Sequence, residues 1–216
     1  MNKRYNYNEQ LEQFFLYVEN INIDNYGAEY ILKNVRDLPI QDILLLIRDS
    51  KYPHPLITPG NIPQFSQFYD YENVLRIVMD SGEKDISFEM LGYYLEGKRS
   101  IRAMVKYGEN HYKLASQMGL VTSGKHRENT FLGSCYRHIK DEEIRHMIGC
   151  KLCLRIPVIW KIMFLACIGP VDISAFLGQY LSPSTAMRRK SNIRKILKLL
   201  QGYDTEERQY IYKNIR

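Results

Sequence analysis

The sequence predicts a mainly α-helical protein with two tandem winged helix-turn-helix units, a helical N-terminal segment and short β-hairpin wings. Apolar residues recur at helical spacing along most of the chain. Three predicted helices between residues 70 and 118 are followed by a predicted two-stranded hairpin, which is the winged-helix order. A short helix, a tight turn and a strongly basic helix then follow between residues 172 and 200. These three observations define the predicted fold class.

The N-terminal segment combines amphipathic helices with a proline-rich stretch. Helical patterns fill residues 8–48, whereas residues 51–67 contain four prolines and one glycine. Because proline and glycine interrupt helices, this stretch predicts a linker or an extended arm. We therefore expect three parts: a helical segment with its linker over 1–67, a first winged-helix domain over 68–140, and a second winged-helix-like domain over 141–216.

In the first predicted domain, three helices precede a wing. The helices are expected over 70–81, 86–95 and 99–118, and the wing consists of short strands at 120–122 and 128–131. Several aromatic and aliphatic residues lie on predicted core faces of these helices, and for the tyrosines packing is the expected role. They are Tyr71, Tyr93, Tyr94 and Tyr112, with Ile101 and Val105 on the third helix.

A polar stripe runs along the third of these helices at i, i+3, i+4 spacing. Together with the predicted wing residues Lys125, His126 and Arg127, it indicates a mainly phosphate-directed contact with DNA. The stripe consists of Arg99, Arg102, Lys106, Asn110, Lys113 and Gln117.

The second predicted domain repeats the theme with helices over 142–153, 156–168, 172–180 and 183–200. Asp172 is expected to cap the short third helix. The tail at 209–213 fits either a second wing or a last helix, and the sequence leaves both open.

The helix at 183–200 has the clearest two-sided pattern of the chain. Ser182 and Pro183 predict its N-cap and first position, and residues 182–200 contain six basic residues and no acidic one. One side of the helix is apolar, with Ala186, Ile193, Ile196, Leu197 and Leu200. The other side carries Ser184, Arg188, Ser191, Arg194, Lys195 and Lys198, with Arg189 beside it.

This two-sided helix predicts a DNA-binding element that lies in a major groove. Ser184, Arg188 and Ser191 are best placed for base edges, and Lys195 and Lys198 for phosphates. The competing interpretation is an ordinary solvated face on a surface helix, which is the usual role of a run of charges.

Charge, apolar segments and cysteine content indicate the kind of partner and the cellular compartment of the protein. The net charge of +6 and the isoelectric point near 9.0 agree with an acidic partner without requiring one. The first residues have no apolar signal-peptide region, and the apolar run at 156–171 is too short and interrupted to span a bilayer. Four cysteines in such a chain favour a reducing compartment. We expect a cytoplasmic protein with no membrane partner.

Two groups of residues form recognisable motifs. The first group consists of Tyr112, Ala115, Met118-Gly119-Leu120 and Thr130-Phe131-Leu132-Gly133; the second consists of Ser184-Thr185-Ala186, Arg188-Arg189 and Ser191. With these motifs, residues 68–200 resemble the paired winged-helix modules of bacterial restriction-modification and phage-defence proteins. The resemblance implies DNA recognition beside a nuclease or ATPase subunit. Tyr107-Gly108 stand where these modules usually have arginine and glutamine.

Enzymatic and metal chemistry has weaker support in the sequence. Glu96-Gly97-Lys98, with Asp80 upstream, has the spacing of a restriction-type nuclease motif but falls in a predicted turn. His146, Cys150 and Cys153 have zinc-ligand spacing, with Cys167, Cys135 or His138 as a fourth ligand, but buried cysteines on a helix are the favoured interpretation. No P-loop motif is present. We therefore predict no catalytic residue and no cofactor.

The resulting hypothesis is a protein that binds double-stranded DNA as a recognition or accessory component of a restriction or phage-defence system. One alternative is a protein-interaction subunit whose winged helices are docking surfaces. Another is a small magnesium-dependent endonuclease that uses Glu96 and Lys98. The helices of segment 1–67 could form a homodimer, which would suit a palindromic DNA site.

Overall fold

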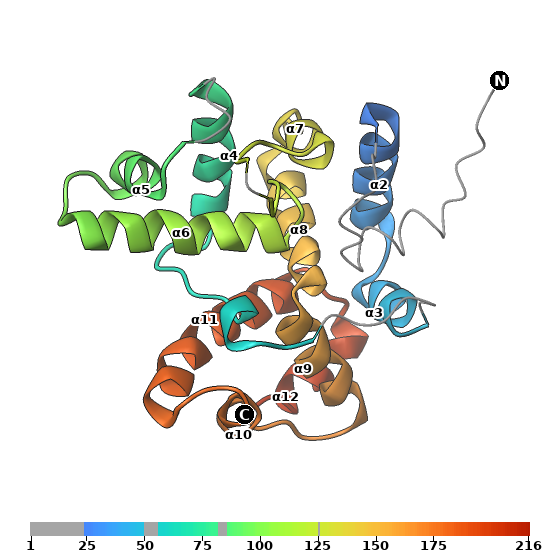
Figure 1. Cartoon of the computed structure of the whole chain (residues 1–216). Helices are drawn as coiled ribbons and strands as arrows, with labels where there is room; N and C mark the ends of the chain where they lie inside the picture. The colour runs from blue at the N-terminus through green and yellow to red at the C-terminus, as the bar shows by residue number, and fades with distance from the viewer. Residues whose placement is uncertain (1–23, 50–55, 82–85, 125) are drawn as a thin grey trace.

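The computed structural model describes residues 24–49, 56–81, 86–124 and 126–216, and their regular structure is helical (Figure 1). The first predicted helix, before residue 24, lies outside the described residues. The helices are α2 (Asn25–Asp37), α3 (Ile40–Arg48), α4 (Asp70–Asp80), α5 (Phe88–Glu96), α6 (Ile101–Gln117), α7 (Phe131–Arg137), α8 (Glu142–Leu152), α9 (Pro157–Ile168), α10 (Ile173–Gly178), α11 (Pro183–Gly202) and α12 (Gln209–Lys213), with 3-10 turns at Pro59–Asn61, Cys153–Arg155 and Glu206–Arg208.

The helices form two groups that α8 connects. Figure 1 shows α4, α5, α6 and α7 in the upper half of the molecule and α9 to α12 in the lower half. Helix α6 crosses the upper half, and α11 lies below it. Buried side chains from both groups and from α2, α3 and α8 belong to one hydrophobic cluster. The predicted order of helices is therefore confirmed, apart from α7, which the sequence analysis missed.

Side-chain caps explain why several helices begin where they do. The Ser87 and Ser100 hydroxyls accept hydrogen bonds from the backbone amides of Met90 and Ala103, which fixes the first turns of α5 and α6. Asp172 accepts two backbone amide bonds at 2.7 and 3.1 Å and caps α10, as predicted. Ser182 and Pro183 occupy the predicted positions at the start of α11, but the Ser182 side chain caps no backbone amide.

The predicted β-hairpin wings are wrong. The described residues contain no strand, and the first predicted wing is reduced to a single bridge between Val121 and Asn129. The reason lies at Thr130, whose hydroxyl accepts from the Gly133 amide and so starts α7 where the second strand was expected. At the tail, residues 209–213 form α12 rather than a second wing.

The proline-rich stretch becomes an extended arm, residues 56–68, that is packed into the core. Ile62, Phe65 and Phe68 are all buried and belong to the same hydrophobic cluster as the helices. Gln117 on α6 donates to the Asn61 carbonyl at 2.7 Å, and Asn192 on α11 donates to the Phe65 carbonyl at 2.5 Å. The arm therefore fastens α6 to α11.

Helix α11 has the two sides that its sequence predicts. Its buried residues are Ala186, Ile193, Ile196, Leu197 and Leu200, which is the predicted apolar set. Helix α9 is largely buried, as expected for the most apolar run of the chain. Among the described residues, no helix combines the length and apolar character needed to cross a membrane.

One buried lysine gives the fold a predicted pH dependence. The Lys151 ammonium is buried, and it donates at 2.7 Å to the carbonyls of Arg36 and Leu38, at the end of α2. Burial lowers the pKa of Lys151 from 10.5 to about 8, although Asp37 and Asp204 act in the opposite direction.

We expect the free energy of unfolding to rise by on the order of 1 kcal/mol between pH 8 and 9.5 because of this group. In that window the unfolded chain still binds the Lys151 proton, whereas the folded chain releases it. Urea denaturation across the window checks the slope, and Lys151→Met should flatten it. An equal slope in both proteins would contradict the assignment.

Candidate nucleic-acid interface

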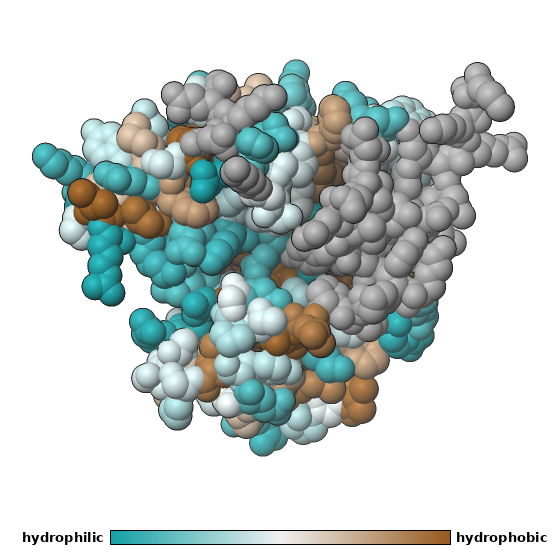
Figure 2. Space-filling model, in the orientation of Figure 1, coloured by the Kyte–Doolittle hydropathy of each residue, from teal (hydrophilic) through white to brown (hydrophobic). Residues whose placement is uncertain are grey.

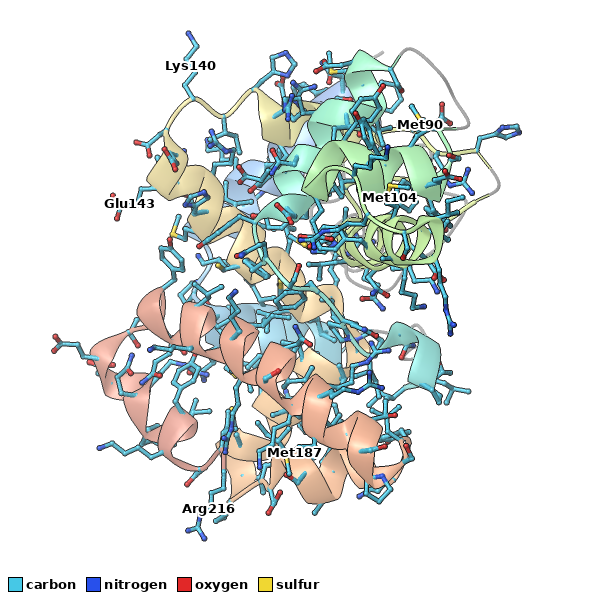
Figure 3. All side chains as sticks on the ribbon, turned by 90° about the vertical axis from the view of Figure 1, so that its left-hand side faces the viewer. Met90, Met104, Lys140, Glu143, Met187 and Arg216 are labelled. Carbon is cyan, nitrogen blue, oxygen red and sulfur yellow. The ribbon has the colours of Figure 1, made fainter. Side chains whose placement is uncertain are left out.

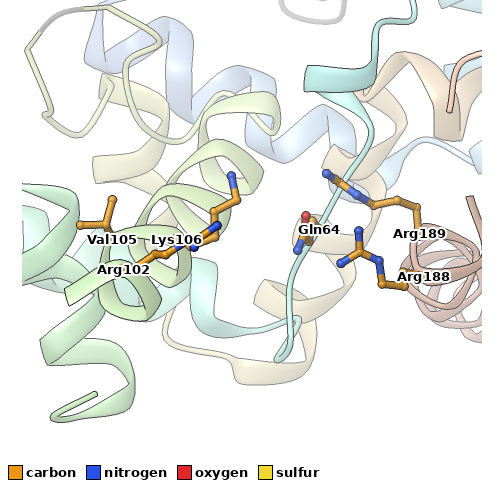
Figure 4. A pocket seen from close by; sticks show the side chains of 6 residues that line it. All are labelled: Gln64, Arg102, Val105, Lys106, Arg188 and Arg189. Carbon is orange, nitrogen blue, oxygen red and sulfur yellow. The ribbon is translucent and has the colours of Figure 1, made fainter. Parts of the chain in front are cut away.

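A basic cleft of about 580 Å³ lies between α6 and α11. Figure 2 shows it as a hydrophilic hollow between the upper and lower halves of the molecule. In Figure 4, the side chains from α6 and α11 extend toward each other with Gln64 of the arm between them. The lining residues are Gln64, Arg102, Val105, Lys106, Arg188 and Arg189. Four of the six carry a positive charge.

The α6 wall is fixed by close backbone packing and by a polar network. A Cβ atom at Gly92 on α5 would lie 1.9 Å from the Met104 carbonyl oxygen, and one at Gly108 would lie 2.2 Å from the Phe88 carbonyl oxygen. Only glycine permits this approach of α5 to α6. On the side of the arm, the Tyr107 hydroxyl donates to Asp70 at 2.8 Å and accepts from Ser66 at 2.8 Å.

A buried histidine completes this network. The His111 ring stacks on Tyr107, its Nδ1 contacts the Tyr107 carbonyl at 2.9 Å, and its Nε2 lies 3.6 Å from the Asp70 carboxylate. Burial lowers the pKa of His111, although Asp70 partly opposes this effect. The neutral histidine therefore serves as a packed structural group beneath the α6 wall.

The α11 wall is held by the arm. Arg189 donates to the Ile62 carbonyl, and Lys195 lies 5.9 Å from the Phe65 ring centroid, in cation–π range. Burial, with a smaller effect of Arg188, lowers the pKa of Arg189, yet a guanidinium stays charged at neutral pH. Arg189 is thus partly committed to the fold, while Arg188 is exposed.

The two walls differ in how far their charges are neutralised. On α6, Glu109 pairs with Lys113 at 2.6 Å and with Lys106 at 2.9 Å, and these hydrogen bonds lower the pKa of Glu109. Arg102 and Arg188, by contrast, form no ion pair within the described residues. These two arginines, one on each wall, are the least compensated charges of the cleft.

The predicted site residues of α11 lie together on one exposed surface. This exposed polar face of α11 begins at the cleft and consists of Ser184, Arg188, Ser191, Arg194, Lys195 and Lys198. Lys198 and Arg194 have no carboxylate partner in the described part of the chain. The predicted exposure of this face is confirmed, and its contact with DNA stays a prediction.

The predicted stripe of α6 is only partly available to a ligand. Arg102 and Lys106 line the cleft, and Arg99 pairs with Glu96 at 3.5 Å. Gln117 is used by the arm, and Asn110 is half-buried. Lys113 is exposed beside Glu109.

The predicted wing does not contribute to the cleft. Arg127 donates to the Ile86 carbonyl at 3.1 Å and lies 4.2 Å from the Phe88 ring centroid, so it secures the loop after α6 against α5. Lys125 lies outside the described residues. The prediction that Arg127 belongs to an exposed wing is therefore wrong.

Two cleft residues were missed by the sequence analysis. Gln64 lies in the proline-rich arm, where no periodic pattern indicates which side chains face outward. Val105 fits the apolar pattern of α6 and was expected in the core, yet 36% of it is exposed at the cleft. No signal in the sequence identifies either residue.

The residues considered for metal chemistry are dispersed or buried. Cys150 and Cys153 are buried in the core, burial raises the pKa of both thiols, and the His146 ring stacks on Tyr69. Glu96 ends α5 and pairs with Arg99, in the turn where the sequence places it. Within the described residues, no three histidine, cysteine or acidic side chains converge as a metal site would require.

Comparison with known proteins identified no similar protein. No protein-family description matches the chain, and no match was found among the curated proteins or the solved structures. The geometry of the cleft is therefore the basis for assigning a function.

Proposed function

We propose that this chain binds double-stranded DNA, with the basic cleft and the adjoining polar face of α11 as its contact surface. One observation carries the proposal. Cationic side chains from two helices that are distant in the sequence line a single cleft, and both Arg102 and Arg188 lack a compensating carboxylate in the described residues. Uncompensated cations at such a cleft favour a polyanionic ligand.

The proposal extends to the way the helices are used. We assign the pairs α5–α6 and α10–α11 the roles of two helix-turn-helix units without β-hairpin wings, with α6 and α11 as their second helices. On α11, Ser184, Arg188 and Ser191 near the N-terminus are assigned to base edges. Arg194, Lys195 and Lys198, with Arg102 and Lys106 across the cleft, are assigned to phosphates.

A salt titration tests this function. If the chain neutralises about five phosphates, its affinity for a random-sequence duplex should fall about 500-fold between 50 and 200 mM salt. Fluorescence anisotropy with a labelled 20-base-pair duplex measures the change. No binding at 50 mM salt would refute the proposal.

The role of a recognition component in a restriction or phage-defence system rests on the resemblance described above, and a nuclease or ATPase subunit is its proposed partner. The alternative function is a docking surface for such a subunit. Exposed apolar residues near the cleft favour it, among them Ile101 at 63% and Val105 at 36% exposure. Salt-insensitive capture of a partner, without DNA binding, would establish that alternative.

A further inference from the structure

The helical hairpin α5–α6 exposes an unusual amount of apolar surface. Met90, Tyr93, Tyr94, Ile101 and Val105 are between 36% and 63% exposed. The tyrosine rings form an edge-to-face pair with centroids 5.7 Å apart. Because the sequence pattern places Tyr93, Tyr94, Ile101 and Val105 in the core, their exposure is a correction to the sequence analysis. In the described part of the chain, these side chains lie outside the hydrophobic core and are available for contact with a ligand.

Part of this surface continues directly into the basic cleft. Val105 lines the cleft, and Ile101 lies one helical turn before it on the same side of α6. Tyr93 is 46% exposed and follows Gly92, which packs on the Met104 backbone of α6, so Tyr93 lies beside the contact between α5 and α6. We call Tyr93, Ile101 and Val105 the apolar ledge. In Figure 2, hydrophobic surface borders the hollow at the outer end of this hairpin.

The size of the cleft limits what can enter it. Its volume of about 580 Å³ is that of pockets which enclose drug-sized molecules, typically 300–1,000 Å³. A DNA duplex, whose major groove alone is roughly 12 Å wide, is too large to enter a cleft of this volume and would lie across its rim, where Arg102 and Arg188 are exposed. One sugar–phosphate backbone with its bases turned outward is small enough. The cleft therefore fits a single strand.

We propose that the preferred ligand is a DNA duplex with a single-stranded extension. The duplex lies on the exposed polar face of α11, the unpaired strand passes between Arg102 and Arg188, and its bases stack on the apolar ledge. This inference rests on the proposed function and specifies its substrate class. Aromatic platforms beside a cationic groove are the general means by which proteins hold unpaired bases.

Charge distinguishes unpaired DNA from a second copy of this chain as the occupant of the ledge. Lys98, Arg99 and Arg102 surround Ile101 in the sequence and are all exposed. A symmetric contact between two copies would bring these like charges together, which is unfavourable. A nucleic-acid strand would instead place its phosphates beside them and its bases against Tyr93. Figure 3 views this side of the molecule, with Met90 on α5 above and Met187 on α11 below.

Competition binding at 100 mM salt tests the inference with three DNA molecules. They are a blunt 20-base-pair duplex, the same duplex with a ten-nucleotide tail, and that tailed duplex with abasic tail positions. We expect the tailed duplex to bind at least tenfold more tightly than the blunt one, since each stacked base contributes roughly 5- to 150-fold. The abasic tail should lose most of this gain. This comparison uses the unaltered protein and so is independent of any effect on folding.

Substitutions assign the gain to the ledge. Tyr93→Ala should abolish the tail preference and leave blunt-duplex affinity within about twofold, whereas Tyr93→Phe should retain it, because stacking needs only the ring. Tyr210→Ala is the matched control, since Tyr210 is 53% exposed on α12 and does not line the cleft.

Salt-dependent binding that is equal for blunt and tailed DNA would overturn the inference and leave the proposed function intact. Absence of all DNA binding would overturn both. Concentration-dependent dimerisation that Ile101→Asp abolishes would assign the ledge to a contact between copies and would also overturn the inference.

Discussion

Replacing Arg102 and Arg188 together with glutamate is expected to lower duplex affinity at least about 100-fold at 100 mM salt. Arg102 is assigned to a phosphate and Arg188 to a base edge, each through a charge-assisted hydrogen bond, and each replacement adds a carboxylate that the phosphates repel. The two residues are exposed, one on each wall of the cleft, and neither forms an ion pair within the described residues. The fold should therefore be unaffected, and the loss should appear in binding alone.

The salt dependence of this variant gives a second, independent readout. Removing the Arg102 phosphate contact should reduce the slope of log affinity against log salt by about one. Lys140→Glu with Lys213→Glu is the matched control, because it changes the net charge equally at exposed positions that do not line the cleft. If the control lost as much affinity as the cleft variant, binding would depend on net charge and not on the cleft.

The sequence predicts α11 accurately because its two-sidedness is a local property. Five apolar residues recur at helical spacing over about four turns, and their burial depends little on how the rest of the chain is arranged. The convergence of α11 and α6 on one cleft is a different matter. It depends on the path of the arm, whose Asn61 and Phe65 carbonyls are bound by Gln117 and Asn192. The sequences of α6 and α11 do not indicate that these side chains bind the arm.

Errors in the sequence prediction for residues 86–131 have two physical causes. Helix α5 is short and apolar on most sides, so helical periodicity does not determine which of Tyr93, Tyr94 and Leu91 faces the core. Thr130 suits both a strand and a helix N-cap, and only its bond to the Gly133 amide selects the helix. The absence of the predicted wing and the exposure of the apolar ledge are therefore both determined by tertiary contacts, which the local sequence does not specify.

Two glycines within helices are a sequence sign of close packing, although the sequence alone does not identify the element that packs against them. Gly92 and Gly108 lie inside helices, where glycine costs about 1 kcal/mol relative to alanine. The close seam between α5 and α6 explains this cost, because each glycine faces backbone atoms of the opposite helix. The same seam holds the α6 wall of the cleft and leaves Ile101 and Val105 outside the core.

Gly92→Ala is accordingly expected to lower the free energy of unfolding by about 3 kcal/mol or more. Its Cβ atom would lie 1.9 Å from the Met104 carbonyl oxygen and 2.6 Å from the Met104 carbonyl carbon. Backbone cannot give way as a flexible side chain can, so the two helices must separate, at a cost at or above the upper end for overpacking. Urea denaturation measures the loss. Helix propensity alone would have made this substitution stabilising.

Gly202→Ala is the matched control, because Gly202 ends α11 and nothing lies within 4 Å of its Cβ position. It should leave stability unchanged or raise it by up to about 1 kcal/mol. Separation of α5 from α6 also displaces Arg102, so Gly92→Ala should weaken duplex binding under conditions in which the protein remains folded. If the Gly92→Ala protein were as stable as the Gly202→Ala protein, α5 and α6 could not be packed as closely as the structure shows. This contact would then not be what fixes the α6 wall.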